Sequence, residues 1–328
     1  MILAGDIGGT KAVLLLARVR SGRVESIFER WYAVASCSGF SALLARFLDE
    51  YRQQGGREAR VGSACFGAAG PVSDARIQMT NLPWRLDGGE LAAEFGFGRV
   101  RLVNDFEAAA NGIEALAPED SAMLQQGEPV PLGARVVIGA GTGLGVAYAL
   151  PRGRQFQVVA GEGGHCAFAP ADEEQMRLWQ TLHAQFGRVS VEHVVSGPGL
   201  ERIYEYLRTR ARPEPTSQQE SVRAEGAAAI SRLALERNDP LACWALDLFI
   251  ACFGAVAGDH ALTVTARGGV YIAGGIAAKV CSRFAAGGFM TAFNAKGVHA
   301  QMNQRMPVCL VTTARLGLLG AALIAARH

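Results

Sequence analysis

Two stretches of the sequence each place a pair of apolar runs around a glycine-rich turn. Residues 4–14 read AGDIGGTKAVL, and residues 135–150 read RVVIGAGTGLGVAYAL. In both, the run before the glycines is typical of a buried strand, and a second run begins directly after the turn. Each stretch therefore predicts two strands joined by a tight turn, and the repetition suggests two halves of related architecture.

The remaining pattern alternates strands with helices, which indicates an α/β fold. We expect strands at residues 3–6, 12–19, 61–66, 100–105, 135–139, 145–150 and 270–273. Helices are expected at residues 106–117, 241–262 and 316–326, and the chain is mainly helical after about residue 172. The polar, proline-bearing residues 208–226 predict an exposed loop.

A change of composition near residue 115 indicates a domain boundary. We expect a small α/β domain from residues 1–115, to which the final helix at about 311–328 returns, and a large α/β domain from residues 116–310. Half of the 328 residues are hydrophobic, which suffices for two domain cores.

Charge and hydropathy limit the classes of partner. The formal net charge is +2, so nothing requires nucleic acid or an anionic membrane. The apolar runs at residues 248–258 and 316–326 are shorter than the ~20 residues that span a bilayer, and the first residues lack the basic flank of a signal peptide. The seven cysteines form no CxxC pair, which disfavours a disulfide framework or zinc cluster. A cytoplasmic protein is expected.

The two glycine turns suit phosphate binding. Neither has the spacing of a P-loop or of the dinucleotide fingerprint, but glycine lets backbone N–H groups approach an anion closely. Asp6 would repel a phosphate unless Mg²⁺ lay between them, held partly through water. Gly141, Thr142 and Gly143 could grip the same polyphosphate. The alternative is that both turns are ordinary glycine hairpins.

Further polar residues stand where chemistry is plausible. Asp105 ends an apolar strand and begins a helix, so it could orient a hydroxyl proton or simply cap the helix. Asn104 beside it could form hydrogen bonds with a ligand or serve as a turn residue. Glu162 and His165 lie three apart in GEGGH, a loop whose glycines disfavour a helix; their side chains suit a polyol, although a lone histidine is often structural.

Seven segments follow one another in an order typical of one family: DIGGTK, GAAGPV, LVNDFEA, GAGTGLG, GEGGH, EHVVSGPGL and YIAGGI. Together they resemble the bacterial glucokinase family, part of the sugar kinase–heat shock protein–actin superfamily. The resemblance implies two ribonuclease H-like (actin-like ATPase) domains with an interdomain active-site cleft, usually in a homodimer. It also implies ATP- and Mg²⁺-dependent phosphorylation of glucose at the 6-hydroxyl, the first step of glycolysis.

The resemblance also assigns roles to residues. Asp105 becomes the catalytic base. The implied substrate-binding residues are Asn104, Asp105, Glu162, His165, Glu192 and Gly70, with Asn81 a weaker candidate, Trp84 more typical of a core and His193 structural. The implied ATP-binding residues are Asp6, Gly8, Gly9, Thr10, Gly141, Thr142, Gly143, Gly274 and Gly275, with Asp6 also holding Mg²⁺.

Two departures and three alternatives accompany this interpretation. Lys11 stands where the closest glucokinases commonly have Asn, and we favour a solvated role for it. CAFAP follows His165 in place of the cysteine-rich zinc motif of ROK sugar kinases, which favours the zinc-free group. The alternatives are a kinase for another hexose or N-acetyl hexosamine, a sugar-sensing regulator, and an actin-like polymerising ATPase. A regulator of this kind carries an N-terminal DNA-binding helix-turn-helix, and we expect none before the first glycine turn.

Overall fold

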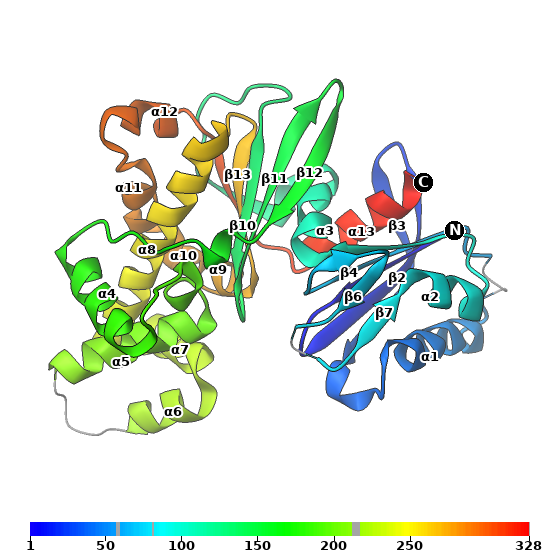
Figure 1. Cartoon of the computed structure of the whole chain (residues 1–328), viewed down its shortest axis with the longest axis horizontal. Coiled ribbons are helices and arrows are strands. Elements are labelled where there is room, and N and C mark those ends of the chain that lie inside the picture. Colours follow the sequence, from blue (N-terminus) through cyan, green and yellow to red (C-terminus); the bar gives the residue numbers. More distant parts are fainter. Residues whose placement is uncertain (57–59, 81, 212–216, 328) are drawn as a thin grey trace. The chain divides into compact units, whose positions relative to one another are not determined.

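The computed structural model describes residues 1–56, 60–80, 82–211 and 217–327 of the chain (Figure 1). These residues separate into two compact units. Unit 1 consists of Met1–Pro118 together with Ala314–His328, and unit 2 consists of Glu119–Thr313. The chain thus returns to its first unit at the end.

Unit 1 is built on a five-stranded sheet in the order β3-β2-β1-β4-β8. Its strands are β1 (Ile2–Ile7), β2 (Lys11–Arg20), β3 (Arg23–Ala33), β4 (Ser63–Ala68) and β8 (Val100–Asn104). The first three are antiparallel neighbours, whereas β1, β4 and β8 run parallel. A small second sheet contains β5 (Val72–Ser73), β6 (Arg76–Gln78) and β7 (Arg85–Asp87). The parallel strands bring their carboxyl ends to one edge.

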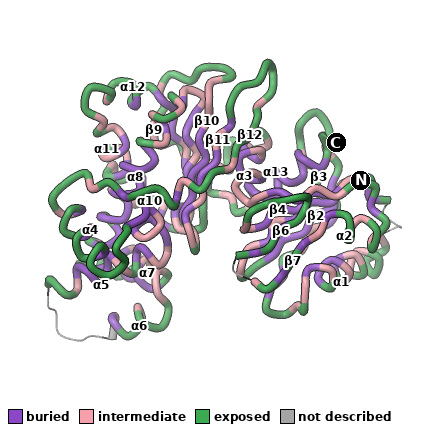
Figure 2. The backbone as a smooth tube through the Cα atoms, viewed as in Figure 1, coloured by how far each residue is buried: buried purple, intermediate pink, exposed green. Residues whose placement is uncertain are grey.

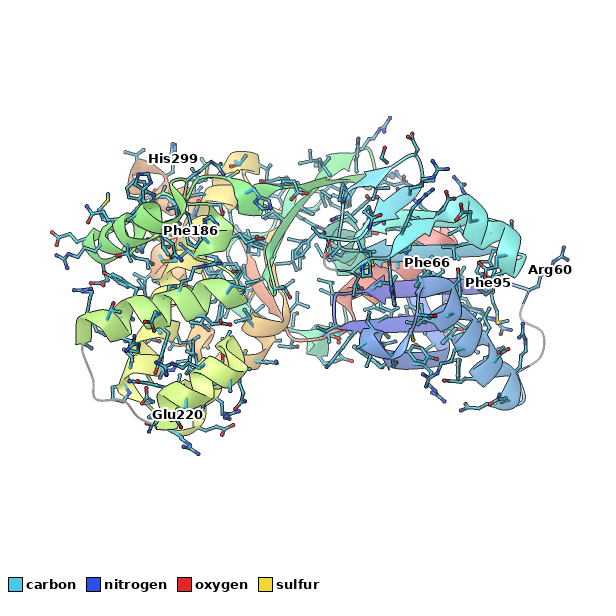
Figure 3. The ribbon with its side chains drawn as sticks, turned by 60° about the horizontal axis from the view of Figure 1, so that its bottom comes forward. Arg60, Phe66, Phe95, Phe186, Glu220 and His299 are labelled. Atoms are coloured by element: carbon cyan, nitrogen blue, oxygen red, sulfur yellow. The ribbon has the colours of Figure 1, made fainter. Side chains whose placement is uncertain are left out.

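Apolar side chains cover both faces of the larger sheet, as the continuous run in β2 predicts. Leu14 and Leu16 join the core formed with α1 (Phe40–Gln53) and α2 (Gly88–Phe95). The alternate residues of β2 face α3 (Asp105–Gly112) and α13 (Leu316–Ala326). On the first face, Phe66, which is labelled in Figure 3, meets the ring of Phe40 edge to face at 4.9 Å between centroids.

Unit 2 contains a six-stranded sheet in the order β12-β11-β10-β13-β14-β9. Its strands are β9 (Ser121–Gln125), β10 (Arg135–Ala140), β11 (Leu144–Arg152), β12 (Gln155–Gly161), β13 (Gly269–Ala273) and β14 (Val308–Val311). Its helices are α4 (Glu173–Phe186), α5 (Gly197–Ala211), α6 (Ser217–Glu225), α7 (Ala227–Glu236), α8 (Pro240–Val264), α9 (Gly275–Lys279), α10 (Cys281–Ala285), α11 (Gly288–Asn294) and α12 (Ala300–Gln304). One continuous core joins the sheet to α5, α7 and α8.

Helix α8 is the central helix of unit 2. It is long and apolar enough, by length and composition, to cross a membrane, but 72% of its apolar window is buried within the protein (Figure 2). Phe249 and Phe253 on this helix are fully buried and lie edge to face. A helix surrounded by protein is apolar on all sides because every side contacts the core. The predicted long apolar helix is therefore confirmed, and it is longer than the run counted from the sequence.

Several other predictions require correction. Residues 208–226 are not one loop, because α5 extends to Ala211 and α6 occupies Ser217–Glu225, while residues 212–216 lie outside the described part. The sequence did not predict these helical segments because their residues are mostly polar and show no clear apolar periodicity. The strand expected at residues 100–105 ends at Asn104, and Asp105 already belongs to α3. Strands β3 and β12 were not predicted, because each mixes exposed polar residues with few buried ones.

The contact between α3 and α13 depends on two glycines. A Cβ atom at Gly320 would collide with the carbonyl oxygen of Ala108, and one at Gly112 would collide with the carbonyl oxygen of Leu316. The two helix backbones therefore touch directly. This contact fixes the helix that carries Asp105 against the returning end of the chain.

We expect Gly320→Ala to lower the free energy of unfolding by roughly 2–3 kcal/mol, because backbone on both sides leaves no space for a methyl group. Urea denaturation of the purified variant measures this. Gly288→Ala on α11 is the matched control, since a Cβ there meets nothing within 4 Å. Equal stability of the two variants would contradict the close helix contact.

Candidate functional site

The carboxyl edge of the parallel strands in unit 1 gathers the predicted polar residues. In the parallel pairing of β1 with β4, Asp6 lies opposite Gly67, and Ala68 at the end of β4 lies opposite Asn104 of β8. Asp105 follows directly as the first residue of α3. Ligands of α/β proteins commonly bind at such an edge. The fold thus brings Asp6, Asn104 and Asp105 into one neighbourhood, as expected.

Asn104 is the N-cap of α3. Its Oδ1 accepts hydrogen bonds from the backbone N–H of Phe106 at 2.9 Å and of Glu107 at 3.3 Å, and its Nδ2 donates to the carbonyl oxygen of Gly70 at 3.5 Å. The helix-capping role considered for Asp105 therefore belongs to its neighbour. Capping anchors the start of α3 and leaves Asp105 in its first turn, where a carboxylate is favoured by the helix dipole.

Gly70 holds the adjacent loop in a conformation that requires glycine. Its φ is +150°, and a Cβ there would lie 2.5 Å from the carbonyl oxygen of Gln78. Thr80 continues this contact by donating its hydroxyl to the carbonyl oxygen of Ala69 at 3.2 Å. The segment after it contributes Trp84, which is 7% exposed and lines a cavity of about 430 Å³ beside the start of α1. Asn81 lies outside the described residues.

Asp6 has an unusual electrostatic environment. Burial is the main cause that raises its pKa to about 7, and the charge of Asp105 is the second. On one side the first turn of α13 packs so closely that a Cβ at Gly317 would lie 2.7 Å from Asp6 Oδ2. Desolvation and a neighbouring carboxylate both disfavour the charged form of Asp6.

This pair fits a divalent cation. Carboxylate oxygens are the preferred ligands of Mg²⁺, which usually keeps several water molecules and needs one or two carboxylates together with substrate phosphates. Within the described ranges, no group of three or more His, Cys, Asp or Glu residues could hold a metal by itself. Asp6 is therefore suited to a shared, water-mediated ion and not to a closed metal cage.

The first glycine turn is a tight hairpin tip between β1 and β2. The N–H of Gly8 donates to the carbonyl oxygen of Lys11 at 2.9 Å, and the carbonyl oxygen of Thr10 accepts from Val34 at 3.0 Å. Gly9 completes the turn, and the side chains of Thr10 and Lys11 are exposed. The hairpin predicted from the sequence is thus confirmed, and its tip follows directly after the Asp6 strand.

The second glycine turn has the same form between β10 and β11. The N–H of Gly141 donates to the carbonyl oxygen of Gly143 at 2.9 Å, so Thr142 lies at the tip. The carbonyl oxygen of Gly141 accepts from Gly197, the first residue of α5, at 2.8 Å. A helix N-terminus favours anions. This end of α5 would therefore favour an anion near the turn.

Gly274 and Gly275 lie at the same edge as this second turn. Strands β10 and β13 are parallel, with Gly139 opposite Ala273. Gly274 has a φ of +94°, and a Cβ there would collide with the carbonyl oxygen of Ala140. At Gly275 a Cβ would meet nothing within 4 Å. Gly274 is thus required by the close approach of backbones, whereas Gly275 leaves space beside the strand ends.

Glu192 is bound to the second turn. Its Oε2 accepts a hydrogen bond from the N–H of Leu144 at 2.8 Å, and a Cβ at Gly143 would lie 2.5 Å from the same oxygen. The resemblance predicts that Glu192 contacts sugar. In the structure its carboxylate also holds the turn that is predicted to bind phosphate. Ser196, buried at 1% exposure, supports this segment by donating to the carbonyl oxygen of Glu192 at 2.7 Å.

Glu162 and His165 lie on one 3-10 turn, Gly163–His165, in which the N–H of His165 donates to the carbonyl oxygen of Glu162 at 2.9 Å. A bridge between Ala167 and Ser190 ties this segment to the turn that carries Glu192. The three predicted polyol-binding side chains of unit 2 therefore come from two adjoining turns.

Arg188, which the sequence did not single out, and His193 add further contacts to this region. Arg188 donates to the carbonyl oxygen of His165 at 2.8 Å. His193, expected to be structural, accepts from the N–H of Ser190 and stacks on Phe186, a 38%-exposed ring at the end of α4 (Figure 3). Neither arginine spacing nor the lone serine at residue 196 offers a recognisable sequence signal.

Comparison with known proteins places this architecture in a family. The family model for Glucokinase matches residues 3–328. The glucokinase of a Synechocystis species is 39% identical over 346 residues, covering 99% of this chain and 98% of that protein. The chain belongs to the glucokinase family. A glucokinase of a Nostoc species is 38% identical, covering 100% of this chain and 99% of that protein.

Solved structures of glucokinases have the same fold. A glucokinase from an Antarctic psychrotroph superposes with a TM-score of 0.85 at 28% identity, covering 100% of this chain and 99% of that one. A ROK family glucokinase from Streptomyces griseus, solved with glucose and AMPPNP, gives a TM-score of 0.69 at 21% identity over 100% of this chain and 99% of that one. At that identity the second likeness concerns the actin-like ATPase fold.

We expect Asp6→Asn to stabilise the protein more at pH 8 than at pH 4. Because the pKa of Asp6 is raised from 3.8 to about 7, the folded protein keeps a proton in this window that the unfolded chain releases, so its contribution to stability falls as pH rises from about 4 to 7. Asparagine removes this loss, which amounts to roughly 1–3 kcal/mol.

Urea unfolding at both pH values measures the difference. Asp105→Asn should show a smaller gain in the same direction, because the charge of Asp105 is the second cause of the shift. A gain for Asp6→Asn that does not depend on pH would contradict the raised pKa.

Proposed function

We propose that this chain is an ATP:hexose phosphotransferase that transfers the γ-phosphate of ATP to the 6-hydroxyl of glucose with Mg²⁺. The observation that carries the proposal is the paired carboxylates of Asp6 and Asp105 at one strand edge, directly beside a glycine hairpin tip. Phosphoryl transfer requires a cation on the phosphates and a group that positions the attacking hydroxyl. One of the two carboxylates can bind the cation, and the other can orient the hydroxyl. Membership of the glucokinase family and the glucose complexes of structural neighbours support this assignment.

In unit 1, Asp105 accepts or orients the proton of the sugar hydroxyl. Its place in the first turn of α3, fixed by the Asn104 cap, holds the carboxylate in a defined position. Asn104 and the backbone at Gly70 contact further hydroxyls. When bound, Mg²⁺ neutralises charge on the β- and γ-phosphates, and Asp6 holds it through water. Gly8, Gly9 and Thr10 offer backbone and hydroxyl donors to phosphate oxygens.

In unit 2, Glu162, His165 and Glu192 bind the sugar. Carboxylates accept hydroxyl protons and a neutral imidazole can do both, so this set recognises several hydroxyls of one polyol. Sites that pair each hydroxyl discriminate by ~10⁴–10⁵-fold against analogues that lack one. The turn at Gly141, Thr142 and Gly143 binds phosphates.

Gly274 and Gly275 complete the nucleotide site of unit 2. The free space at Gly275 suits the adenosine part of ATP, because no side chain occupies it. Since Glu192 also holds the turn at residues 141–143, the sugar and phosphate sites of this unit are mechanically joined.

The wider setting follows the same proposal. The enzyme works in the cytoplasm as a homodimer in the first step of glycolysis, with neither nucleic acid nor membrane as a partner. In this proposal residues 1–115 with about 311–328 form a small domain, and residues 116–310 form a large domain. A second candidate is a kinase for another hexose or N-acetyl hexosamine, because the same polar set could serve a related sugar.

A coupled assay with ATP and Mg²⁺ tests the substrate. The panel contains glucose, mannose, fructose, N-acetylglucosamine and N-acetylmannosamine, and ADP and polyphosphate are compared as donors. We expect kcat/KM for glucose to exceed the others by at least ~10²-fold. A preference for another sugar would keep the mechanism and change the specificity, whereas no turnover with any pair would overturn the proposal.

We expect Asp105→Ala to retain glucose binding and to lower kcat by roughly 10²–10⁴-fold, because proton acceptance occurs in the transition state and not in the ground state. Steady-state kinetics and a glucose titration by calorimetry measure the two effects. Asp49→Ala, which removes an exposed carboxylate on α1 of the same unit, is the control. Near-normal kcat in Asp105→Ala would exclude this residue as the base.

A further inference from the structure

A polar pair lies directly behind the turn that carries Glu162 and His165. The Tyr148 hydroxyl on β11 and Nδ1 of His260 on α8 are 2.7 Å apart, a short hydrogen bond between side chains 112 residues apart in sequence. Both side chains are half-buried. The pair therefore connects the sheet of unit 2 to its central helix.

The histidine ring presses against the backbone of the turn. A Cβ atom at Gly163 would lie 2.8 Å from His260 Cε1 and 2.8 Å from Val146 Cγ2. At Gly164 a Cβ would collide with the carbonyl oxygen of Leu144. Close packing thus explains Gly163 and Gly164, which lie against the imidazole ring on one side and β11 on the other. Where the ring lies decides where the turn can lie.

Electrostatics keep the pair neutral. Burial lowers the pKa of His260, although the nearby Asp259 opposes this, and burial raises the pKa of Tyr148, with the charge of Cys166 as a smaller cause. A neutral imidazole and a phenol form one directional hydrogen bond, so the ring is held in one orientation. Val146, two residues before Tyr148 on β11, lies against Gly163 of the same turn.

We propose that Tyr148 and His260 are positioning residues that fix the turn at residues 162–165 and thereby set the affinity for glucose. The inference rests on the proposed function, because it concerns the sugar contacts of Glu162 and His165. Neither residue of the pair touches the reacting phosphate or the nucleotide turns in this assignment. Their effect acts through the backbone of Gly163, which the imidazole ring contacts.

A polar pair suits this role better than an apolar one. An apolar ring at residue 260 could turn or shift at small cost, whereas a hydrogen bond between half-buried groups penalises every orientation that breaks it. Catalytic and binding groups must be held to within a fraction of an ångström, and this precision comes from side chains behind the site.

We expect Tyr148→Phe to raise KM for glucose roughly 5–30-fold, with kcat and KM for ATP changed by less than about 3-fold, since ground-state sugar contacts are displaced while the phosphate turns stay in place. Tyr206→Phe is the matched control. It also removes a hydroxyl hydrogen bond in unit 2, to Glu174 at 2.7 Å, on a helix that does not carry the turn. Equal effects of the two variants on every constant would overturn the proposal.

Variants of the histidine separate orientation from simple packing. His260→Asn keeps a donor and acceptor near the position of Nδ1 and should recover most of the glucose affinity that His260→Ala loses. Because the two residues act as one unit, Tyr148→Phe combined with His260→Ala should be no worse than His260→Ala alone. Additive losses in the double variant would exclude a shared role.

Hydrogen exchange gives a readout that does not depend on activity. In Tyr148→Phe, the amides of residues 163–166 should exchange at least ~10-fold faster than in the unmodified protein, and Tyr206→Phe should leave them unchanged. Unchanged exchange would overturn the positioning role itself. Faster exchange in a chain that phosphorylates no sugar would instead keep the pair and reject the proposed function.

Discussion

The parallel pairing of β1, β4 and β8 is the constraint on which unit 1 depends. Its register brings Asp6 to the same edge as Asn104 and Asp105, where burial first and the charge of Asp105 second raise the pKa of Asp6. The contact is tightened by glycine, because Gly317 leaves room for the Asp6 carboxylate at the first turn of α13. The ionised form of the Asp6 carboxylate is therefore unfavourable in this setting, and a bound cation would stabilise it.

The turns of unit 2 are held in place in a different way from the strand edge of unit 1. Its turns carry few charges, and they are held by backbone contacts and by the carboxylate of Glu192, which accepts the N–H of Leu144. Under the proposed function the same side chain also binds the sugar, so a movement of the turn at residues 141–143 would change the sugar contacts. The Tyr148–His260 pair lies behind the neighbouring turn. Hydrogen bonds and packing behind the turns, rather than many ionic groups, hold the candidate site of unit 2.

Sequence patterns predicted much of the fold and the site. Long apolar runs marked the two hairpins, α8 and α13, because continuous burial requires continuous apolar residues. The ordered motifs indicated the family and named Asp105, Glu162, His165 and Glu192. Sequence patterns did not predict the elements that are polar and whose structure depends on distant contacts. These are α6, which was assigned to a loop, and β3, an edge strand whose side chains are mostly exposed.

By itself, the sequence determined the α/β class and the two glycine hairpins, because these follow from local composition and spacing, and its motifs named candidate reactive groups. Tertiary structure decided which groups cooperate. Asn104 became the cap because its oxygen accepts from the N–H groups of Phe106 and Glu107. The N–H of Phe106 also donates to Asp105 Oδ1 at 3.0 Å. The partnership of Tyr148 with His260 required β11 and α8 to pack together, and no local pattern records a contact across 112 residues.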